Sequence, residues 1–337
     1  MTLLWMDGFD HLINGTQFVD KGYNSNLASA YLKTDYARFS GKGIKLIAHG
    51  FYFVKNFGAD KSTIYMGIAF KMADTVYPGY SSGEPLISFY DESSVYQVKI
   101  HANSGFGFSA YDGGNTSLGS TSNNIWKPWR WYYIEVKVTI SATVGEVTMK
   151  LNETQVLNLT SKDTKYGSDY IRSIKINGMY NGRDTWWDDF YIDDAQFHGD
   201  CQVNIFMPDA DGNSSDFTRS TGSNDYECVD EVDANEDTDY ISSNTLNHKS
   251  IFGITTGSRG TVKGVQVNNH CRIDDAGTRK ITPIIRSNST DYSGTETEAI
   301  TSDYLWESEI FETDPDDSNV WTQTKLEAAE FGLEITT

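Results

Sequence analysis

Cysteine, proline and long apolar runs are all scarce in this sequence. Its 337 residues include 3 cysteines and 6 prolines. The cysteines (Cys201, Cys228 and Cys271) are odd in number and form no Cys-x-x-Cys pair, so buried free thiols are expected rather than a disulfide scaffold. No stretch approaches the roughly 18–20 apolar residues of a membrane span, so membrane insertion is not expected either.

The first residues also lack the features of a secretory leader. The start, MTLLWMDGFDHL, has neither the basic segment nor the longer apolar core of a signal peptide, which predicts a protein made and folded in a cytoplasm. The 6 histidines are scattered singly, and Gly-x-Ser-x-Gly, phosphate-loop and His-Glu-x-x-His motifs are missing. From these absences we expect a protein that is not an enzyme.

Positive charge is scarce, above all in the second part of the chain. The sequence has 27 Lys+Arg against 47 Asp+Glu, a formal net charge of −20. Residues 1–200 carry 18 against 21, which gives −3, and residues 201–337 carry 9 against 26, which gives −17. Such acidity disfavours nucleic acid, whose phosphates it would repel, and anionic membrane surfaces. It is compatible with a cationic partner or with divalent cations.

The residues that are abundant indicate an all-β protein. Aromatic residues make up 13% of the chain and there are 29 glycines, a composition typical of strands and tight turns. Alternating apolar and polar segments, separated by turns rich in Gly, Asn or Ser, recur about every ten residues. The clearest are residues 44–54, 62–72, 84–91, 94–102, 105–112, 129–141 and 145–154. This spacing predicts a sandwich of two antiparallel sheets.

The segment WRWYYIEVKVTI predicts which side chains of one strand face the core and which face water. Its even-numbered residues, from Tyr132 to Ile140, are apolar and are expected to face the core. Its odd-numbered residues, from Trp131 to Thr139, are expected to face water. The interpretation places Tyr132 in the core, and truncating it would then cost about 3–5 kcal/mol.

A second region begins near Asp200, where the loops become long and acidic. Strands are expected in CQVNIFMP, in DYIS, and in residues 249–256, 261–274, 279–287, 298–313 and 332–337. Thr322 can cap a short helix whose Leu326 faces inward and which ends at Gly332. We therefore expect two β-sandwich domains of jelly-roll type, residues 1–199 and 200–337, the second with a short C-terminal helix.

Three pieces of the first region resemble a known family. Asp-Gly-Phe-Asp lies near the first strand, a tryptophan precedes the long middle strand, and the region closes with W-x-D-D-F-Y-I-D-D. Together they resemble the concanavalin A-like lectin fold in its laminin-G-like form, over roughly residues 3–198. The resemblance implies that the first and last strands lie side by side.

The second region is similar to the C-terminal half of tailed-bacteriophage structural proteins. The similarity rests on a strand that ends in Pro and then Asp-Gly-Asn, on STGSNDYE-x-VDE, on DYISS, and on a closing GLEIT. Such proteins commonly carry a laminin-G-like front half, so the resemblance covers nearly the whole chain. It implies a virion component, assembled in the host cytoplasm and in contact with other virion proteins.

The closing segment DTWWDDFYIDD, residues 184–194, is open to three interpretations. In the first, Asp188 and Asp189 accept hydrogen bonds that tie this strand to the segment around Asp7–Asp10. In the second, a cation lies between the two acidic segments. In the third, the carboxylates are catalytic, but glycosidases of this fold carry Glu-x-Asp-x-(x)-Glu, which is absent. Strict alternation places Trp186, Asp188, Phe190 and Ile192 on one face and Trp187, Asp189, Tyr191 and Asp193 on the other.

One segment has the spacing of a calcium loop. In DADGNSSD the oxygen-bearing residues are Asp209, Asp211, Asn213 and Asp216. The glycine stands at the fourth position and no glutamate stands at the twelfth, so the segment is not an EF-hand. Ca²⁺ is thus a candidate ligand, and an Asx-rich turn between strands is the alternative.

Two classes of function fit the sequence. The first is a tail- or fibre-associated protein that attaches to a host cell-surface glycan, with Tyr80, Tyr111, Tyr180 and Trp187 as candidate sugar contacts. The second is a capsid decoration protein, cement or head fibre, without a ligand-binding role. Virion symmetry predicts a trimer or another small homo-oligomer in either case. A cellular lectin-like protein is a third class, disfavoured by the missing leader.

Overall fold

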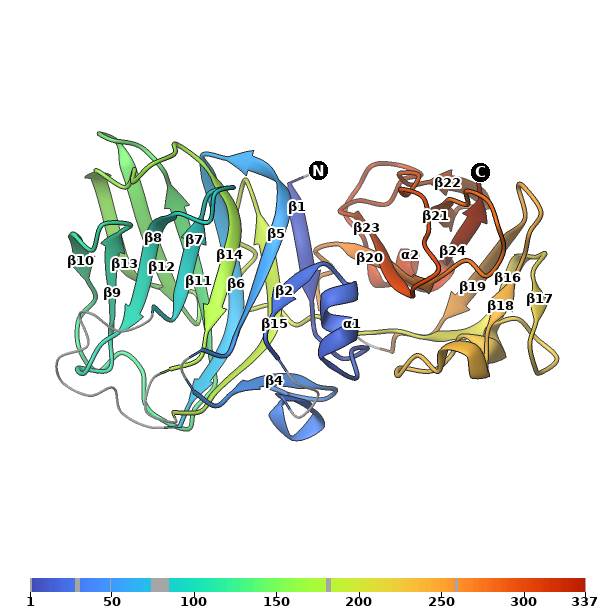
Figure 1. Cartoon of the computed structure of the whole chain (residues 1–337), viewed down its shortest axis with the longest axis horizontal. Coiled ribbons are helices and arrows are strands. Elements are labelled where there is room, and N and C mark those ends of the chain that lie inside the picture. The colour runs from blue at the N-terminus through green and yellow to red at the C-terminus, as the bar shows by residue number, and fades with distance from the viewer. Residues whose placement is uncertain are drawn as a thin grey trace. The chain divides into compact units, whose positions relative to one another are not determined.

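The computed structural model describes residues 2–27, 31–48, 50–73, 85–179, 183–257 and 260–336. It divides into two compact units, Thr2–Val203 and Asn204–Thr337, here called the first and second sandwich (Figure 1). Antiparallel strands dominate both, which confirms the expected all-β class. No helix among the described residues is long and apolar enough to cross a membrane.

Two sheets build the first sandwich. Sheet A has the order β13-β12-β11-β6-β15-β4-β3, with β1 paired to β15, and sheet B has the order β10-β9-β8-β7-β14-β5-β2. The strands of sheet A are β1 (Leu3–Asp7), β3 (Leu32–Lys33), β4 (Gly43–Leu46), β6 (Thr63–Met72), β11 (Tyr132–Thr139), β12 (Gly145–Leu151), β13 (Thr154–Lys162) and β15 (Thr185–Asp193). Those of sheet B are β2 (Tyr23–Ser25), β5 (Tyr52–Lys61), β7 (Ile87–Tyr90), β8 (Tyr96–Ala102), β9 (Phe108–Asp112), β10 (Ser117–Ser120) and β14 (Ile171–Asn177).

The first and last strands of this sandwich are neighbours. β1 pairs antiparallel with β15, from Leu3 opposite Asp193 to Asp7 opposite Phe190. This pairing confirms the expectation drawn from the family resemblance. Between β1 and β2 lies helix α1 (Gly15–Asp20), capped by the Asn14 side chain, and a single 3₁₀ turn covers Thr34–Tyr36. The sequence analysis expected neither.

Strand β11 obeys the predicted alternation on its inner face only. Ile134, Val136 and Val138 are fully buried between the sheets, as expected. On the outer face, however, Tyr133 and Glu135 are also buried, because later segments of the chain cover that face. Tyr132 is only half-buried, so the expectation that it is the large core tyrosine of this strand is wrong.

One predicted strand is two strands in the structure. The segment 44–54 reads as a continuous strand, but it contains the end of β4 in sheet A and the start of β5 in sheet B. The chain changes sheets around Gly50, whose φ of +93° lies in the left-handed region that favours glycine.

The second sandwich contains a five-stranded sheet of order β16-β19-β24-β21-β22 and two ribbons, β17-β18 and β20-β23. Its elements are β16 (Pro208–Ser215), β17 (Thr218–Arg219), β18 (Ile241–Ser242), β19 (Lys249–Ile254), β20 (Val265–Cys271), β21 (Ile281–Ser287), β22 (Thr290–Ser293), β23 (Leu305–Phe311), α2 (Gln323–Ala328) and β24 (Glu330–Ile335). Single 3₁₀ turns lie at Tyr226–Cys228 and Glu236–Thr238. Two apolar clusters, around Ile281 and around Trp321, form its core.

The short C-terminal helix forms where the sequence predicted it. The Thr322 hydroxyl accepts a hydrogen bond from the Lys325 backbone N–H at 3.2 Å, and Leu326 is buried. The helix ends at Ala328 rather than at Gly332. Gly332 lies inside β24, where a Cβ atom would stand 2.0 Å from the Ser250 carbonyl oxygen. That glycine therefore permits close strand packing and does not cap the helix.

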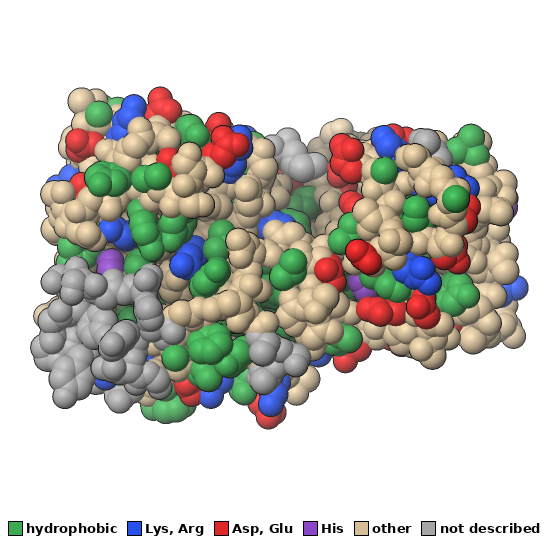
Figure 2. Space-filling view, viewed as in Figure 1, with side chains coloured by type: hydrophobic (Ala, Val, Ile, Leu, Met, Phe, Trp, Pro, Cys, Tyr) green, Lys and Arg blue, Asp and Glu red, His purple; other side chains and the backbone are tan. Residues whose placement is uncertain are grey.

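Figure 2 shows several acidic side chains on the visible face of the second sandwich. This unit is coloured gold to red in Figure 1. The visible face of the first sandwich carries lysine and arginine side chains among apolar ones. The charge difference counted in the sequence is thus visible on the surfaces of the two units. An anionic ligand is repelled less by the first sandwich than by the second.

The difference in burial between Tyr132 and Tyr133 gives a direct test of the register of β11. Tyr133→Ala should lower the free energy of unfolding by about 3–5 kcal/mol, because the side chain is 1% exposed and its hydroxyl donates to the Asp189 carbonyl at 2.9 Å. Tyr132→Ala should cost about 1–2 kcal/mol, since its ring is half-buried. Urea unfolding of both variants measures the two costs. A larger cost at Tyr132 would contradict the register.

Candidate functional site

A β-bulge in β15 decides which side chains of DTWWDDFYIDD face the core and which face the outer side of sheet A, where Trp186 is still only 7% exposed. Asp188 pairs with Ala69 of β6, but Tyr191 pairs with the next-but-one residue, Gly67, so β15 holds one extra residue. Asp189 has a φ of +52°, a left-handed conformation that is unusual for aspartate. The extra residue reverses the alternation of every side chain beyond it.

The tryptophans on the near side of the bulge therefore have opposite environments. Trp187 is fully buried and its ring lies 5.9 Å from that of Phe70 in the core. Trp186 points to the outer face of sheet A. Beyond the bulge, Phe190 and Ile192 face the core and Tyr191 faces outward. The strict alternation predicted from the sequence is wrong across this strand.

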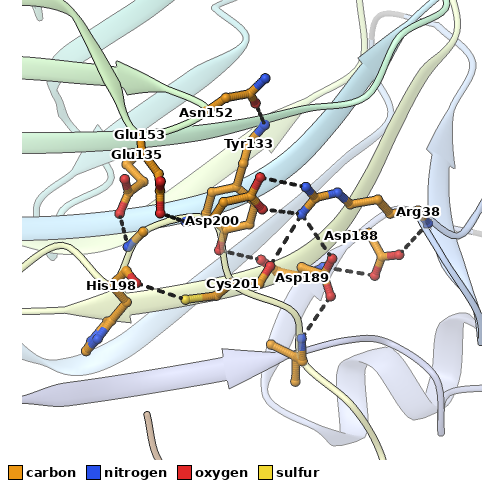
Figure 3. A network of polar contacts seen from close by, with 12 residues as sticks. Arg38, Tyr133, Glu135, Asn152, Glu153, Asp188, Asp189, His198, Asp200 and Cys201 are labelled. Carbon is orange, nitrogen blue, oxygen red and sulfur yellow. Dashed lines mark hydrogen bonds and ion pairs between the residues drawn. The ribbon is translucent and has the colours of Figure 1, made fainter. Parts of the chain in front are cut away.

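The two aspartates at the bulge bind backbone N–H groups from distant segments (Figure 3). The Asp188 carboxylate accepts from the Arg38 N–H at 2.7 Å and from the Asp189 N–H at 2.8 Å. The Asp189 carboxylate accepts from the Val203 N–H at 2.9 Å and lies 3.6 Å from the Arg38 guanidinium. These contacts bind the bulge to Arg38, which precedes β15 in the sequence, and to Val203, which follows it.

The guanidinium of Arg38 extends this network to the segment 194–203. It forms an ion pair with Asp200 at 2.7 Å and lies 5.4 Å from the centre of the Tyr133 ring. It also donates to the Cys201 carbonyl at 3.4 Å. Figure 3 shows Arg38 reaching between Asp200 and Asp189, so the segment is held flat against the outer face of sheet A.

A second group of contacts anchors the same segment. The buried Glu135 carboxylate accepts from the Tyr191 hydroxyl at 2.6 Å and from the Gly199 N–H at 2.8 Å. His198 bonds to Asp193 at 2.8 Å through its ring. Because residues 194–203 pack here, the first unit extends to Val203 rather than to the boundary at 199 expected from the sequence.

Burial raises the pKa values of the carboxyl groups around the bulge. It raises the pKa of Asp188 to about 8 and that of Asp189 to about 6, and the charge of Asp189 raises that of Asp188 further. Burial likewise raises the pKa of Asp10 to about 7, although the Lys42 N–H donates to its carboxylate at 2.6 Å. The sequence analysis expected Asp188 and Asp189 to bond to the Asp7–Asp10 segment, but the bonds described here go to Arg38 and Val203 instead.

Asp7 belongs to a separate buried cluster at the α1 end of the sandwich. It accepts from the Tyr23 hydroxyl at 3.0 Å and lies 3.4 Å from the Lys21 ammonium. Burial acts to raise the pKa of Asp7, but Lys21 and His11 bring it below the ordinary value. Burial lowers the pKa of Lys55, whose ammonium lies 3.2 Å from the centre of the Trp5 ring, to about 7. Nothing in the sequence pattern predicted lysines here.

The four candidate calcium ligands lie on and just after a strand rather than in a loop. Asp209, Asp211 and Asn213 are part of β16, and Asp216 follows it, so both the calcium loop and the Asx-rich turn are wrong. The Asp211 carboxylate accepts from the Tyr226 N–H, and that of Asp216 accepts from the Lys249 N–H. Within the described ranges no group of three or more His, Cys, Asp or Glu residues could hold a metal ion.

The candidate sugar contacts are not brought together. Tyr80 and Tyr180 lie outside the described residues. Trp187 is in the core and cannot touch a ligand without unfolding. Tyr111 is half-buried on the outer face of sheet B, where its ring meets that of His101 edge-on at 5.1 Å. Of the two candidates that the structure describes, Tyr111 is the one placed where a sugar could reach it.

A different aromatic cluster lies on the outer face of sheet A, and we call it the tryptophan patch. It consists of Tyr36, Lys45, Lys71, Trp129, Trp131 and Trp186. Trp186 of β15 pairs with Lys45 of β4 on one side and with Lys71 of β6 on the other. Trp129 packs on Trp186 at 5.4 Å between ring centres.

Trp129 is the most accessible part of the patch. Its side chain is 65% exposed, and its φ of +61° places a bulky residue in the left-handed region. The strained conformation is fixed by a hydrogen bond from the Trp129 N–H to the Met72 carbonyl at 2.8 Å. Strain of this kind costs about 1–3 kcal/mol and concentrates at functional sites.

Sequence reasoning missed this patch although its signal was present. The residues KPWRW carry two tryptophans spaced to share one face of a strand. The alternation predicts that Trp131 faces water on a strand, and the sequence analysis names Trp187, not its neighbour Trp186, as a sugar contact. The bulge at Asp189 and the conformation of Trp129 reverse that choice.

No family model and no curated protein matches the chain. Solved structures that resemble it include a β-1,4-glucuronan lyase from Trichoderma reesei, with 9% identity over 51% of this chain and 87% of that chain and a TM-score of 0.38. An alginate lyase has 12% identity over 57% and 97%, with a TM-score of 0.39. A β-glucanase catalytic domain from Podospora anserina has 14% identity over 58% and 98%, with a TM-score of 0.38. At this identity the likeness concerns the fold alone.

The expectation that the chain is not an enzyme is contradicted by these neighbours. Two are lyases and one is a glucanase, so polysaccharide-active enzymes occur among structures of this kind. The motifs whose absence supported the expectation belong mainly to α/β hydrolases, zinc proteases and phosphate-binding folds. Their absence therefore excludes those classes and leaves catalysis on a β-sandwich open.

The raised carboxyl pKa values predict a pH dependence of stability. The folded protein binds protons at Asp188, Asp189 and Asp10 more tightly than the unfolded chain, whose carboxyls titrate near 3.8. The free energy of unfolding should therefore fall as the pH rises from about 4 to about 8. Asp188→Asn should flatten this slope, and urea unfolding at a series of pH values measures it.

Asp163→Asn is the matched control, because Asp163 is exposed on the same sandwich. Its slope should equal that of the wild type, and an equally steep slope for Asp188→Asn would refute the assignment. A bound cation would give another pattern. A chelator would then lower the melting temperature of the wild type but not of Asp189→Asn, whereas hydrogen bonding alone predicts no effect of the chelator.

Proposed function

We propose that the first sandwich binds carbohydrate at the tryptophan patch. The observation that carries the proposal is Trp129, a large aromatic side chain exposed at 65% in a strained backbone conformation. An isolated exposed tryptophan needs no explanation, but this one lies on Trp186 and close to a row of cations. Folding alone would favour glycine at this position.

The chemistry of the patch fits a sugar ring. Indole rings offer flat apolar surfaces to the C–H groups of a pyranose, and the polar groups around them fix its orientation. Lys45 and Lys71 supply such groups on either side of Trp186. Their strands are neighbours of β15 in sheet A, so the platform is rigid before a ligand arrives.

We further propose that the chain displays this patch on the surface of a tailed-bacteriophage particle. The support is the sequence resemblance of residues 201–337 to phage structural proteins, together with the laminin-G-like character of the front half. In this proposal the second sandwich attaches to other virion proteins, and the first sandwich contacts a glycan of the host surface. A homo-oligomer would multiply a weak sugar affinity by presenting several patches at once.

Substitution of Trp129 tests the binding proposal. Trp129→Ala should abolish retention on a host-envelope polysaccharide column and on a glycan array. Trp129→Gly should abolish it equally, yet it should lower the free energy of unfolding by about 1 kcal/mol less than Trp129→Ala, because glycine adopts a φ of +61° without strain.

Val144→Ala is the control, since Val144 is 70% exposed on the same sandwich and lies outside the patch. It should bind as the wild type does. If both Trp129 variants keep full affinity while folding normally, the patch is not the glycan site.

Localisation tests the virion proposal separately. An antibody raised against the chain should label purified particles of the phage that encodes it, and peptides of the chain should appear in their protein digest. Labelling of the tail or fibres agrees with attachment, whereas labelling of the capsid favours a decoration protein. Absence from purified particles would refute the virion proposal.

A further inference from the structure

The cations of the tryptophan patch are not equivalent. Lys45 forms an ion pair with Asp184 at 2.6 Å, so its charge is already balanced. Lys71 forms no ion pair with any carboxylate among the described residues. Its ammonium instead lies 4.6 Å from the centre of the Trp186 ring and 4.9 Å from that of Trp131.

This environment leaves the charge of Lys71 available to a ligand. The two indoles remove water from the ammonium, and this burial lowers its pKa. Cation–π contacts with the indole faces compensate for part of the lost hydration but bring no opposite charge. A partly dehydrated cation binds an anion more strongly than a fully hydrated one, because the interaction is less screened.

The patch is also unusual in an acidic chain. The formal net charge is −20, so the molecule as a whole repels anions. Among the described residues the Lys71 ammonium has no carboxylate partner, whereas Lys137 of the same sheet is paired with Glu146 at 2.6 Å.

We propose that the tryptophan patch binds an acidic glycan, with an anionic group of the sugar, a carboxylate or a phosphate, on the Lys71 ammonium. The proposal rests on the proposed glycan-binding function and names the chemical class of its ligand. Trp129 contacts the sugar ring with the buried Trp186 packed beneath it, and the Lys71 ammonium binds the anionic group.

Three paired residues across sheet A place Lys71 beside the proposed sugar site. Lys45, Trp186 and Lys71 stand on adjacent strands at paired positions, and Trp131 follows next to Lys71 just before β11. Neighbouring strands are about 4.8 Å apart, so a sugar ring on Trp129, which packs on Trp186, brings a substituent within reach of Lys71 on the next strand. Lys71 is therefore placed beside the sugar rather than under it.

The experiment compares three polymers on the full-length wild-type chain. The first is an acidic polysaccharide that carries uronic acids, the second is the same polymer with its carboxyl groups reduced to alcohols, and the third is a polymer of glycerol phosphate that carries sugar substituents. Affinities are measured by surface plasmon resonance at low and at physiological salt.

The wild type should bind an acidic polymer at least about tenfold more tightly than the reduced one, the worth of one charge-assisted hydrogen bond. Added salt should weaken that preference. The first and third polymers distinguish a carboxylate from a phosphate as the anion. Lys71→Gln should lose the preference, so that its affinities for the acidic and the reduced polymer become equal, and Lys71→Arg should keep most of the preference.

Lys137→Gln is the matched control, because Lys137 lies on the same face of sheet A but is paired with Glu146 outside the patch. It should keep the wild-type preference. Equal wild-type affinity for acidic and reduced polymers would overturn the acidic-glycan assignment and leave glycan binding standing. Loss of the preference in Lys137→Gln as well as in Lys71→Gln would also overturn it. Binding of none of the polymers by a folded wild type would instead count against the proposed function itself.

Discussion

The left-handed conformation of Asp189 is the constraint on which the surface of the first sandwich depends. The extra residue that it accommodates in β15 turns Trp187 and Phe190 into the core and leaves Trp186 and Tyr191 outside. Such a conformation is unfavourable unless its surroundings fix it. Here the carboxylates of Asp188 and Asp189 accept N–H groups from Arg38 and Val203, and these bonds make the bulge the stable arrangement.

The same contacts determine how much of sheet A remains accessible. Arg38 and Glu135 bind the segment 194–203, which covers Tyr133 and the middle of the outer face. The tryptophan patch lies on β4, β6 and β15 away from that cover, with Trp129 added from the loop before β11. Acidic residues that suggested a ligand site in the sequence thus act as structural supports. The recognition surface that we propose, the tryptophan patch, is aromatic and cationic.

The sequence predicts those features of the structure that follow from local patterns, and it fails where contacts between distant residues decide the structure. The inner-face alternation of β11 and the Thr322 cap are local patterns, the pairing of the end strands was implied by a sequence resemblance, and these three features were predicted. The bulge depends on a hydrogen bond between Asp188 and Arg38, which are 150 residues apart in the sequence. No local sequence pattern therefore predicts it. Strict alternation consequently selected Trp187 instead of Trp186. The calcium loop failed for a related reason, since pairing with β19 made its residues a strand.

A structure of the full-length chain with a bound acidic oligosaccharide tests the central claim most directly. The account predicts a sugar ring stacked on Trp129, with an anionic group in contact with the Lys71 ammonium. A sugar bound instead on the outer face of sheet B, over Tyr111 and His101, with the tryptophan patch empty, would contradict it.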